Sequence, residues 1–225
     1  MSDKITRVAT DVGGTFTDLV YFETDTRSGA QSVRTEKSDT TPPDFEKGVL
    51  DVLAKAGVEL ESLDFLAHGT TVVINSLTER KGAKVGLITT RGFRDVLEIG
   101  RGNRPDFFNL KYKKPEPFVA RYLRRELAGR IDFHGNEQVP LDLSGLAQIV
   151  ADFRADGVTA VAICFIHAYA NPSHEEAALA ELRRLWPDVV AVASHQITRE
   201  WREYERTSTT ILSAYVQPAA QRYLE

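Results

Sequence analysis

Two adjacent glycines, Gly13 and Gly14, separate two runs of strand-forming residues near the start of the chain. Residues 5–10 (ITRVAT) precede them, and residues 15–23 (TFTDLVYFE) follow. β-Branched and aromatic residues favour strands, and glycines between two such runs are typical of a turn. A third extended run, residues 31–37, comes after a turn-rich segment. The N-terminal part is therefore predicted to form a meander of three strands.

A helix and two further strands are predicted after this meander. Thr41 and Pro42 provide an N-cap and a first-turn signal, and apolar residues then recur at helical spacing until Gly57. Residues 64–80 predict a strand, a Gly-Thr-Thr turn and a short helix, and residues 83–90 predict another strand.

The C-terminal part has the most regular pattern. A helix capped by Asp142, a buried apolar strand over residues 158–166, and a second helix and strand are predicted there. A last helix is predicted from Thr198 onwards, with Trp201 and Tyr204 on its apolar face. The alternation of strands and helices indicates an α/β fold.

The segment between these parts, residues 91–140, shows no sustained period and is rich in Gly, Pro, Asn and Arg. We expect loops and short strands there, because a long stretch without clear elements is more often functional or inserted than a linker. The chain is therefore predicted to have three parts, at residues 1–90, 91–140 and 141–225.

Composition and charge argue against several classes of partner. The chain has 225 residues, a formal net charge of -4 and no tract dense in lysine and arginine, which disfavours nucleic acid or an anionic membrane. We find no secretory signal pattern and no apolar run that approaches the length of a membrane span, so a cytoplasmic protein is expected. The single cysteine, Cys164, lies in an apolar run and is predicted to be buried.

The glycine turn has the chemistry of a phosphate-binding loop. Glycine lets backbone N–H groups approach phosphate oxygens closely and adopts the positive φ values that a tight turn can require. The hydroxyls of Thr15 and Thr17 add donors, and Asp11 can hold Mg²⁺ through water. The alternative is a Gly-Gly hairpin turn with ordinary strand threonines. Spacing alone does not decide between these interpretations.

A second turn, HGTT, repeats this chemistry. Gly69 stands beside the hydroxyls of Thr70 and Thr71, while His68 and Asn75 add an imidazole and an amide. This turn is a candidate to bind the phosphates or the substrate. The alternative is a tight turn with a core histidine whose hydrogen bonds are satisfied by neighbours.

The loop GRGNRP supplies a further candidate for substrate binding. Arg101, Asn103 and Arg104 can clamp an anionic group by hydrogen bonds, and the alternative is a solvated basic loop. Other motifs are missing: we find no P-loop, no dinucleotide fingerprint, no HExxH or paired-cysteine pattern and no G-x-S-x-G. A Rossmann cofactor, a structural zinc site and a serine hydrolase therefore have no support.

Five segments, taken in order, resemble the N-terminal part of a known family. They are DVGGTFTD, HGTTVVINSLTER, GLITTRGFRDVLEIGRGNRP, NPSHE and REYERTSTTILSAYV. They are similar to the hydantoinase A and oxoprolinase family, which includes N-methylhydantoinases, 5-oxoprolinases and the ATP-using subunits of acetone and acetophenone carboxylases. The resemblance spans nearly the whole chain. It implies an α/β fold, the ribonuclease-H-like half of the actin, Hsp70 and sugar-kinase ATPase fold, with an inserted α/β layer.

The resemblance also implies an activity and roles for residues. The implied enzyme is an ATP-dependent amidohydrolase that phosphorylates the oxygen of a cyclic amide, such as a hydantoin or 5-oxoproline, before water attacks. Asp11 would be both the catalytic and the metal-binding residue, because it would orient Mg²⁺ or the nucleophile at the γ-phosphate. The residues implied to bind the nucleotide are Gly13, Gly14, Thr15, Thr17, Gly69, Thr70 and Thr71, and the candidates for the substrate are His68, Asn75 and Arg104.

The chain is shorter than members of this family, which have several hundred residues. The fold needs a second phosphate loop and an adenosine-binding turn from its other half, so we expect a fragment or a subunit that borrows the rest. The implied partners are a small cyclic amide or ketone and a hydantoinase B-type subunit in an oligomer. A ketone carboxylase subunit, and a nucleotide-driven switch or reactivating chaperone of the same fold, remain open as alternatives.

Overall fold

The computed structural model describes residues 4–102, 106 and 108–224 of the chain. It forms two compact units: unit 1 consists of Met1–Lys81 and Arg222–Glu225, and unit 2 of Gly82–Gln221. Unit 1 contains β1 (Lys4–Val12), β2 (Phe16–Asp25), β3 (Gln31–Asp39), α1 (Phe45–Lys55), a 3-10 turn (Leu60–Ser62), β4 (Phe65–Thr70) and α2 (Val72–Thr78). Unit 2 contains β5 (Val85–Thr90), α3 (Val96–Ile99), a 3-10 turn (Arg121–Leu123), β6 (Arg124–Ile131), β7 (Glu137–Asp142), α4 (Leu146–Ala155), β8 (Ala160–Cys164), α5 (Ser173–Leu185), β9 (Val190–Ala193), α6 (Ser194–Ile197) and most of α7 (Glu203–Leu224).

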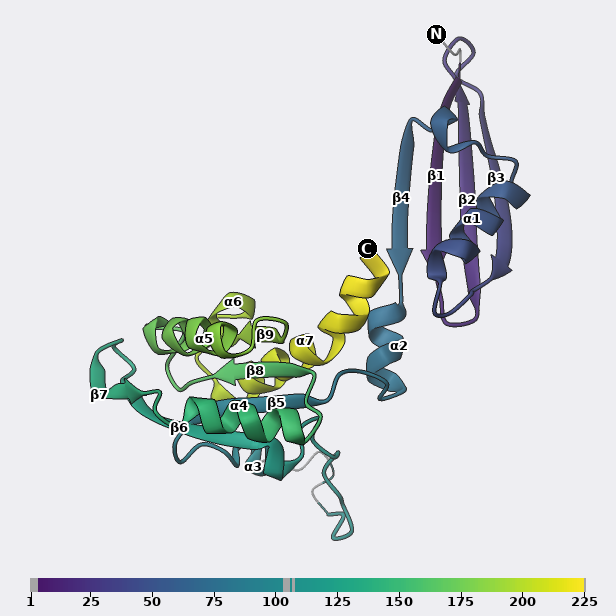
Figure 1. Cartoon of the computed structure of the whole chain (residues 1–225). Coiled ribbons are helices and arrows are strands. Elements are labelled where there is room, and N and C mark those ends of the chain that lie inside the picture. The colour runs from purple at the N-terminus through teal and green to yellow at the C-terminus, as the bar shows by residue number, and fades with distance from the viewer. Residues whose placement is uncertain (1–3, 103–105, 107, 225) are drawn as a thin grey trace. The chain divides into compact units, whose positions relative to one another are not determined.

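Unit 1 is a four-stranded mixed sheet with α1 lying across it (Figure 1). The strand order is β3-β2-β1-β4, with β1, β2 and β3 antiparallel and β4 parallel to β1. This confirms the predicted meander and the strand, turn and helix predicted over residues 64–80. Apolar residues on alternate strand positions pack against α1, as period-two burial requires. The core of the unit consists of Val8, Leu19, Tyr21, Val52, Leu53 and Val58.

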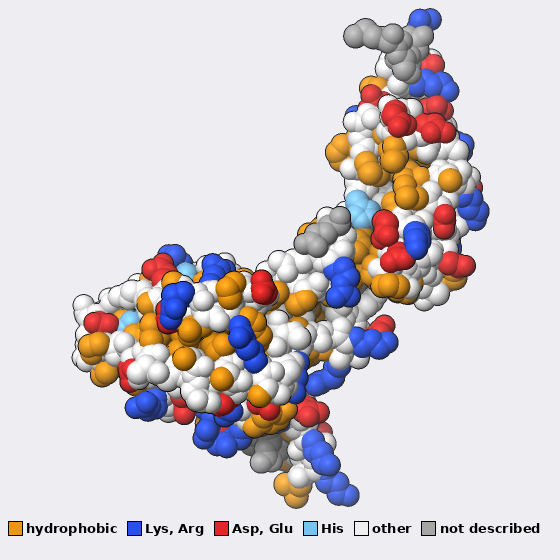
Figure 2. Space-filling view, viewed as in Figure 1, with side chains coloured by type: hydrophobic (Ala, Val, Ile, Leu, Met, Phe, Trp, Pro, Cys, Tyr) orange, Lys and Arg blue, Asp and Glu red, His pale blue; other side chains and the backbone are white. Residues whose placement is uncertain are grey.

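Strand β4 is an edge of this sheet and carries apolar residues on both of its faces. Phe65 is 58% and Leu66 42% exposed. Phe65 and Ala67 line a groove on the face away from α1, and Leu66 lines a second groove with residues of α1. Figure 2 shows hydrophobic side chains gathered on the surface of unit 1. A strand that is apolar on both faces is typical of the interior of a sheet, so β4 has the composition of an inner strand.

Unit 2 is a five-stranded mixed sheet in the order β7-β6-β5-β8-β9, in which only β7 is antiparallel to its neighbour among the described strands. The buried strand predicted around Cys164 is confirmed as β8, every residue of which is buried. β6 and most of β7 lie within residues 91–140, where the sequence indicated loops and short strands, and β7 continues to Asp142. The sequence of β6 has no clear period because it carries charged residues, among them the buried Arg124.

Two helix boundaries in unit 2 differ from the prediction. Asp142 does not cap α4, because it is the last residue of β7 and its Oδ1 accepts a hydrogen bond from Ser144 N at 2.9 Å. The last helix begins at Glu203 and not at Thr198. Trp201 therefore lies outside the helix and is 65% exposed, so its prediction as a core residue was wrong.

The architecture confirms the α/β class, with a mixed sheet in each unit. Among the helices within residues 4–102, 106 and 108–224, none has the length and hydropathy needed to cross a membrane.

Candidate functional site

The two candidate turns of the sequence lie side by side in unit 1. β1 and β4 are parallel, so their carboxyl ends meet at the same edge of the sheet, where Asp11 pairs with Gly69 and Val12 with Thr70. The crevice beyond the carboxyl ends of parallel strands is the usual position of ligands in α/β folds. The sheet therefore brings together two turns that lie about 55 residues apart in the sequence.

The glycine turn is a three-residue loop, Gly13 to Thr15, between β1 and β2. Gly13 N donates to Phe16 O at 2.9 Å, and Thr15 O accepts from Thr40 N at 2.9 Å. The N–H groups of Gly14 and Thr15 find no acceptor among the residues that the structure describes, and both residues are exposed. The loop therefore presents two backbone donors, which suits an anionic ligand.

Close approach of neighbouring atoms, and not a positive φ angle, favours glycine at both positions, in contrast to the reason expected from the sequence. Neither Gly13 nor Gly14 has a positive φ. A Cβ on Gly13 would lie 3.0 Å from Phe16 O, and a Cβ on Gly14 would lie 3.0 Å from Asn75 Nδ2. Gly14 therefore allows α2, which carries Asn75, to pack directly against the turn.

The Asp11 carboxylate lies on the sheet face away from α1 and is exposed. Its Oδ1 would be 3.4 Å from a Cβ at Gly69, so the small residue leaves room for the carboxylate. Asp18 stands directly opposite Asp11 in the β1–β2 pair, and Lys37 Nζ lies 3.0 Å from Asp18 Oδ1. Two carboxylates directly opposite repel each other, so a cation between or beside them is stabilising. The sequence reasoning missed Asp18 and Lys37 as site residues, although antiparallel register around a short turn could have indicated Asp18.

The predicted threonines differ in position. Thr17 is fully buried beneath the turn, on the face that packs against α1, and its Oγ1 lies 3.2 Å from Thr40 Oγ1. The hydroxyls of Thr70 and Thr71 donate to Val12 O at 3.3 and 3.4 Å, and Thr71 N donates to the same oxygen at 3.0 Å. These bonds attach the β4–α2 turn to the end of β1.

His68 belongs to the opposite face of the sheet from Asp11. It pairs with Thr10 in the register, and Thr10 Oγ1 lies 2.6 Å from His68 Nδ1. His68 Nε2 is hydrogen-bonded to the hydroxyl of Tyr223, from the last turn of α7, and the two rings stack with centroids 5.7 Å apart. Because successive residues of a strand point to opposite faces, the His68 imidazole and the Asp11 carboxylate lie on opposite faces of the sheet.

Asn75 lies against the glycine turn, and its Nδ2 donates to Thr71 Oγ1 at 3.3 Å. Arg104 and Asn103 lie outside the described residues. Among the residues described, no group of three or more His, Cys, Asp or Glu side chains is arranged to hold a metal ion. A cation at Asp11 would therefore need oxygen ligands from a bound molecule as well as from the protein.

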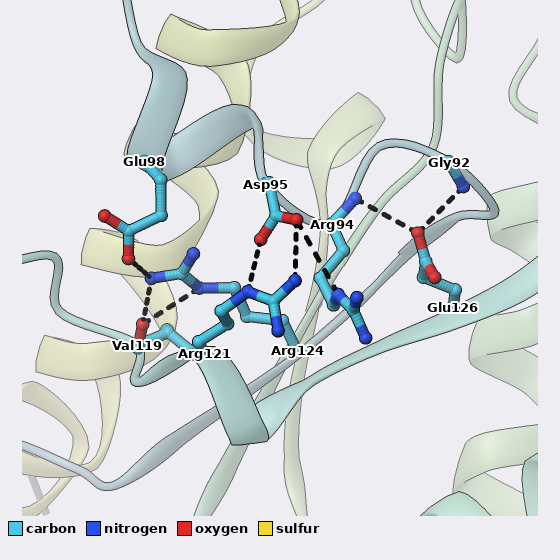
Figure 3. A network of polar contacts seen from close by, with 8 residues as sticks. All are labelled: Gly92, Arg94, Asp95, Glu98, Val119, Arg121, Arg124 and Glu126. Carbon is cyan, nitrogen blue, oxygen red and sulfur yellow. Dashed lines mark hydrogen bonds and ion pairs between the residues drawn. The ribbon is translucent and has the colours of Figure 1, made fainter.

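A second polar network holds the segment after β5 in unit 2 (Figure 3). Asp95 accepts two hydrogen bonds from Arg121, both at 2.9 Å, and the Arg121 guanidinium lowers the pKa of the Asp95 carboxyl. Arg124, only 2% exposed, donates to Val119 O and, at 2.9 Å, to Glu98 Oε1. This network fixes α3 on the start of β6. Sequence reasoning missed it, because nothing local shows that Arg124 is buried.

The fold and the site define an α/β protein with a glycine turn at the carboxyl ends of two parallel strands. The chain matches the model of the hydantoinase/oxoprolinase N-terminal region over residues 7–185, and it belongs to this family. The resemblance seen in the sequence motifs is thereby confirmed.

The chain is similar to parts of larger enzymes. It is 38% identical to caprolactamase subunit alpha of Pseudomonas jessenii, over 100% of this chain and 33% of that protein. It is 32% identical to the acetophenone carboxylase gamma subunit of Aromatoleum aromaticum, over 97% of this chain and 32% of that protein. The crystal structure of the ATP-dependent caprolactamase from Pseudomonas jessenii matches with a TM-score of 0.82 and 35% identity, over 97% of this chain and 32% of that chain. The chain therefore spans about a third of the length of these relatives.

Proposed function

We propose that this chain supplies the phosphate-binding part of an ATP-dependent enzyme that phosphorylates and hydrolyses a cyclic amide. The observation that carries the proposal is the pairing of β1 with β4, which places Asp11 and the exposed glycine turn beside Gly69. Membership of the hydantoinase/oxoprolinase family and similarity to an ATP-dependent caprolactamase support it. A cytoplasmic location, where ATP is available, forms part of the proposal.

The residues of the turn fit a nucleotide phosphate. Gly14 and Thr15 offer two exposed N–H groups, and a side chain at Gly13 or Gly14 would crowd its neighbours. Asp11, with Asp18 opposite, offers the hard oxygen ligands that Mg²⁺ prefers, and Mg²⁺ is commonly held by one or two carboxylates together with phosphates. Thr15 would add its hydroxyl, whereas Thr17, Thr70 and Thr71 would act through the shape of the turns, because their hydroxyls already have partners or are buried.

The chain's own groups would position the phosphates of ATP and neutralise their negative charge. When bound, ATP would supply a phosphoryl group that makes the amide oxygen a good leaving group for attack by water. The N–H groups of Gly14 and Thr15 would orient phosphate oxygens, and Asp11 would hold the cation that offsets their charge. Asn75 would keep α2 in contact with the turn and so fix its shape.

We further propose that the part expected over residues 1–90 contributes the phosphate-binding part of a ribonuclease-H-like half of the actin, Hsp70 and sugar-kinase fold, with residues 91–140 and 141–225 inserted into it. Within residues 1–90, β5 pairs with β6 and β8 and so belongs to unit 2, which leaves residues 1–81 for this role. Three antiparallel strands followed by a strand parallel to the first support this assignment. The apolar faces of β4 support additional polypeptide beside it, from the rest of a longer chain or from a hydantoinase B-type subunit in an oligomer.

The test is the variant Asp11→Asn, with Asp51→Asn, an exposed carboxylate on α1, as the matched control. Calorimetry on the assembly that supplies the rest of the fold should show Mg²⁺-dependent ATP binding that is weakened at least about tenfold by Asp11→Asn and unchanged by Asp51→Asn. In the assembly with a partner subunit, phosphate release should rise with a hydantoin or a lactam. ATP binding that is equal in both variants, or turnover that no cyclic amide stimulates, would contradict the proposal.

A ketone carboxylase subunit is the second candidate, favoured by the similarity to the acetophenone carboxylase gamma subunit. The same phosphoryl transfer would then trap the enol of a ketone. This function predicts bicarbonate-dependent turnover with acetone or acetophenone and none with cyclic amides.

A further inference from the structure

The segment after α3 carries the two most exposed large apolar side chains among the residues that the structure describes. Phe108 is 90% and Leu110 91% exposed. Figure 1 shows this segment extending as a loop from the helices and strands of unit 2, and Figure 2 shows hydrophobic and basic side chains at its end. We call residues 108–114 the Leu110 tip. Exposed apolar residues scattered singly are normal, but two within three residues of a projecting loop are typical of an interaction site.

Hydrogen bonds within the Leu110 tip and at its base hold its shape. Tyr112 N donates to Asn109 O at 3.1 Å, which closes a turn with Leu110 and Lys111 at its centre. Lys111 N also donates to Asn109 Oδ1 at 3.0 Å, a side-chain bond that is typical of ordered turns. At the base, Lys114 Nζ donates to two backbone carbonyls at the end of α3, at 2.6 and 3.1 Å. The tip is therefore ordered before a partner binds, which reduces the entropic cost of binding.

The Leu110 tip is basic although the chain as a whole is acidic. Residues 108–114 contain three lysines and no acidic residue, whereas the chain has a formal net charge of -4. Lys111 and Lys113 are exposed, and neither forms an ion pair with another residue that the structure describes. Aromatic residues are enriched and lysines depleted at the centres of interfaces, whereas charged groups belong to the rim. The complementary surface is therefore an apolar depression bordered by carboxylates.

A protein surface fits the Leu110 tip better than a membrane or a nucleic acid does. Basic segments that recognise anionic lipids have clusters of about four to eight lysines and arginines, and residues 108–114 contain three lysines. Nucleic-acid binding depends on many phosphate contacts, which the net charge of -4 opposes. A protein with a local acidic rim requires only a local match of charge.

We propose that the Leu110 tip docks into an apolar depression, bordered by carboxylates, on the B-type subunit of the assembly. Phe108 and Leu110 would fill the depression, and Lys111 and Lys113 would pair with the carboxylates at its rim. The proposed function supplies the identity of this subunit, so the inference rests on it, but that function assigns no role to this loop.

The first test measures the dissociation constant between the B-type subunit and the protein that carries the tip, in the assembly that supplies the rest of the fold. Phe108→Ser removes an apolar anchor, and Phe133→Ser is its matched control, because Phe133 is 64% exposed in the turn between β6 and β7 of the same unit. Phe108→Ser and Leu110→Ser should each weaken binding at least about tenfold, and the control should leave it within about twofold. Unchanged binding by the tip variants, or equal weakening by the control, would overturn the proposal.

A second test addresses the rim. Lys111→Glu reverses one charge of the tip, and Arg183→Glu does the same on α5, where Arg183 is exposed and has no ion pair among the described residues. Stopped-flow measurements should show an association rate constant about tenfold lower for Lys111→Glu and a weaker dependence of that rate on salt, with little change for Arg183→Glu. An equal effect of both variants would show a general charge effect and refute a docking site at the tip. Thermal melts establish that each variant is folded.

The other possible occupants are tested with the same variants. The probes are vesicles of equal parts phosphatidylcholine and phosphatidylserine, a single-stranded oligonucleotide, and a second copy of the protein followed by light scattering. We expect Phe108→Ser and Lys111→Glu to change none of these interactions. A vesicle, oligonucleotide or self-association signal that the tip variants abolish, with binding of the B-type subunit unchanged, would overturn the proposal.

Phosphate release by the same preparations separates this inference from the proposed function. Assembly that depends on Phe108 and Leu110, with turnover that no cyclic amide stimulates, would reject the proposed function alone. Turnover that a cyclic amide stimulates, in an assembly that forms equally well with the tip variants, would reject docking of the Leu110 tip alone.

Discussion

Gly14→Ala tests whether the glycine turn is shaped by α2. The new Cβ would lie 3.0 Å from Asn75 Nδ2, whereas ordinary contacts begin at 3.4 Å, so the Asn75 amide has to withdraw. Its bond to Thr71 Oγ1, at 3.3 Å, is already long and is the first to be lost. Loss of such a bond lowers the free energy of unfolding by about 1 kcal/mol.

An opposing effect acts on the unfolded chain. The φ of Gly14 is not positive, so alanine fits the backbone and reduces the entropy of the unfolded state, which is worth about 0.4–1 kcal/mol. Gly14→Ala should therefore be nearly neutral by itself. In the Asn75→Ala background the crowded amide is gone, and the same change should stabilise unit 1 by about 0.4–1 kcal/mol. The coupling energy of the double-mutant cycle is then about 1 kcal/mol.

The assay has to report on unit 1. Both tryptophans, Trp186 and Trp201, lie in unit 2, so their fluorescence does not serve. Hydrogen exchange of core amides such as those of Val8 and Leu19 gives the free energy of opening of unit 1 directly. An effect of Gly14→Ala that is the same with and without Asn75 would refute the contact between the turn and α2.

Three further predictions concern unit 2. Gly86→Ala places a Cβ 2.6 Å from the buried Phe153 ring, so we expect urea unfolding to show a loss of about 1–3 kcal/mol, largely recovered with Phe153→Leu. Burial, and then the charges of Arg130 and Arg206, lower the pKa of His167. The contribution of His167 to stability is therefore full above pH 6.5 and is lost as the pH falls through the lower pKa of the folded state. Asparagine tolerates the φ of 58° at this position, so His167→Asn should flatten the dependence of the free energy of unfolding on pH. Burial raises the pKa of the Cys164 thiol, so a thiol reagent should react with it only after unfolding.

Elements with strong local signals were predictable from the sequence. The meander β1–β3, the strand, turn and helix around Gly69, and the buried strand β8 all follow from periodicity and turn residues. These elements also set the position of the candidate site, because two turns rich in glycine and hydroxyl groups follow two strands. Which strands pair, and in which register, depends on contacts between distant segments and has no local signal.

Buried charges explain most of what the sequence did not indicate in unit 2. Arg206 is 1% exposed and donates to Phe165 O at 2.7 Å and to Ser194 Oγ at 3.1 Å. Glu175 is fully buried and accepts hydrogen bonds from Phe165 N, Ser194 and His195. Charged residues are almost never fully buried unless they are paired, so sequence patterns assign them to the surface. Only the fold brings the partners of these charged residues within reach. The sequence therefore assigned Trp201, and not Arg206, to the buried face of the last helix.

The composition of the site is a consequence of strand alternation. HGTT reads as one motif, yet successive residues of β4 point to opposite faces of the sheet. Gly69 pairs with Asp11 on the open face, whereas His68 pairs with Thr10 on the face of α1 and binds Tyr223 there. A motif that is contiguous in sequence is thus divided between two surfaces. Antiparallel register acts in the opposite way, because it brings Asp18 opposite Asp11 across a three-residue turn and adds a carboxylate that no motif assigned to the site.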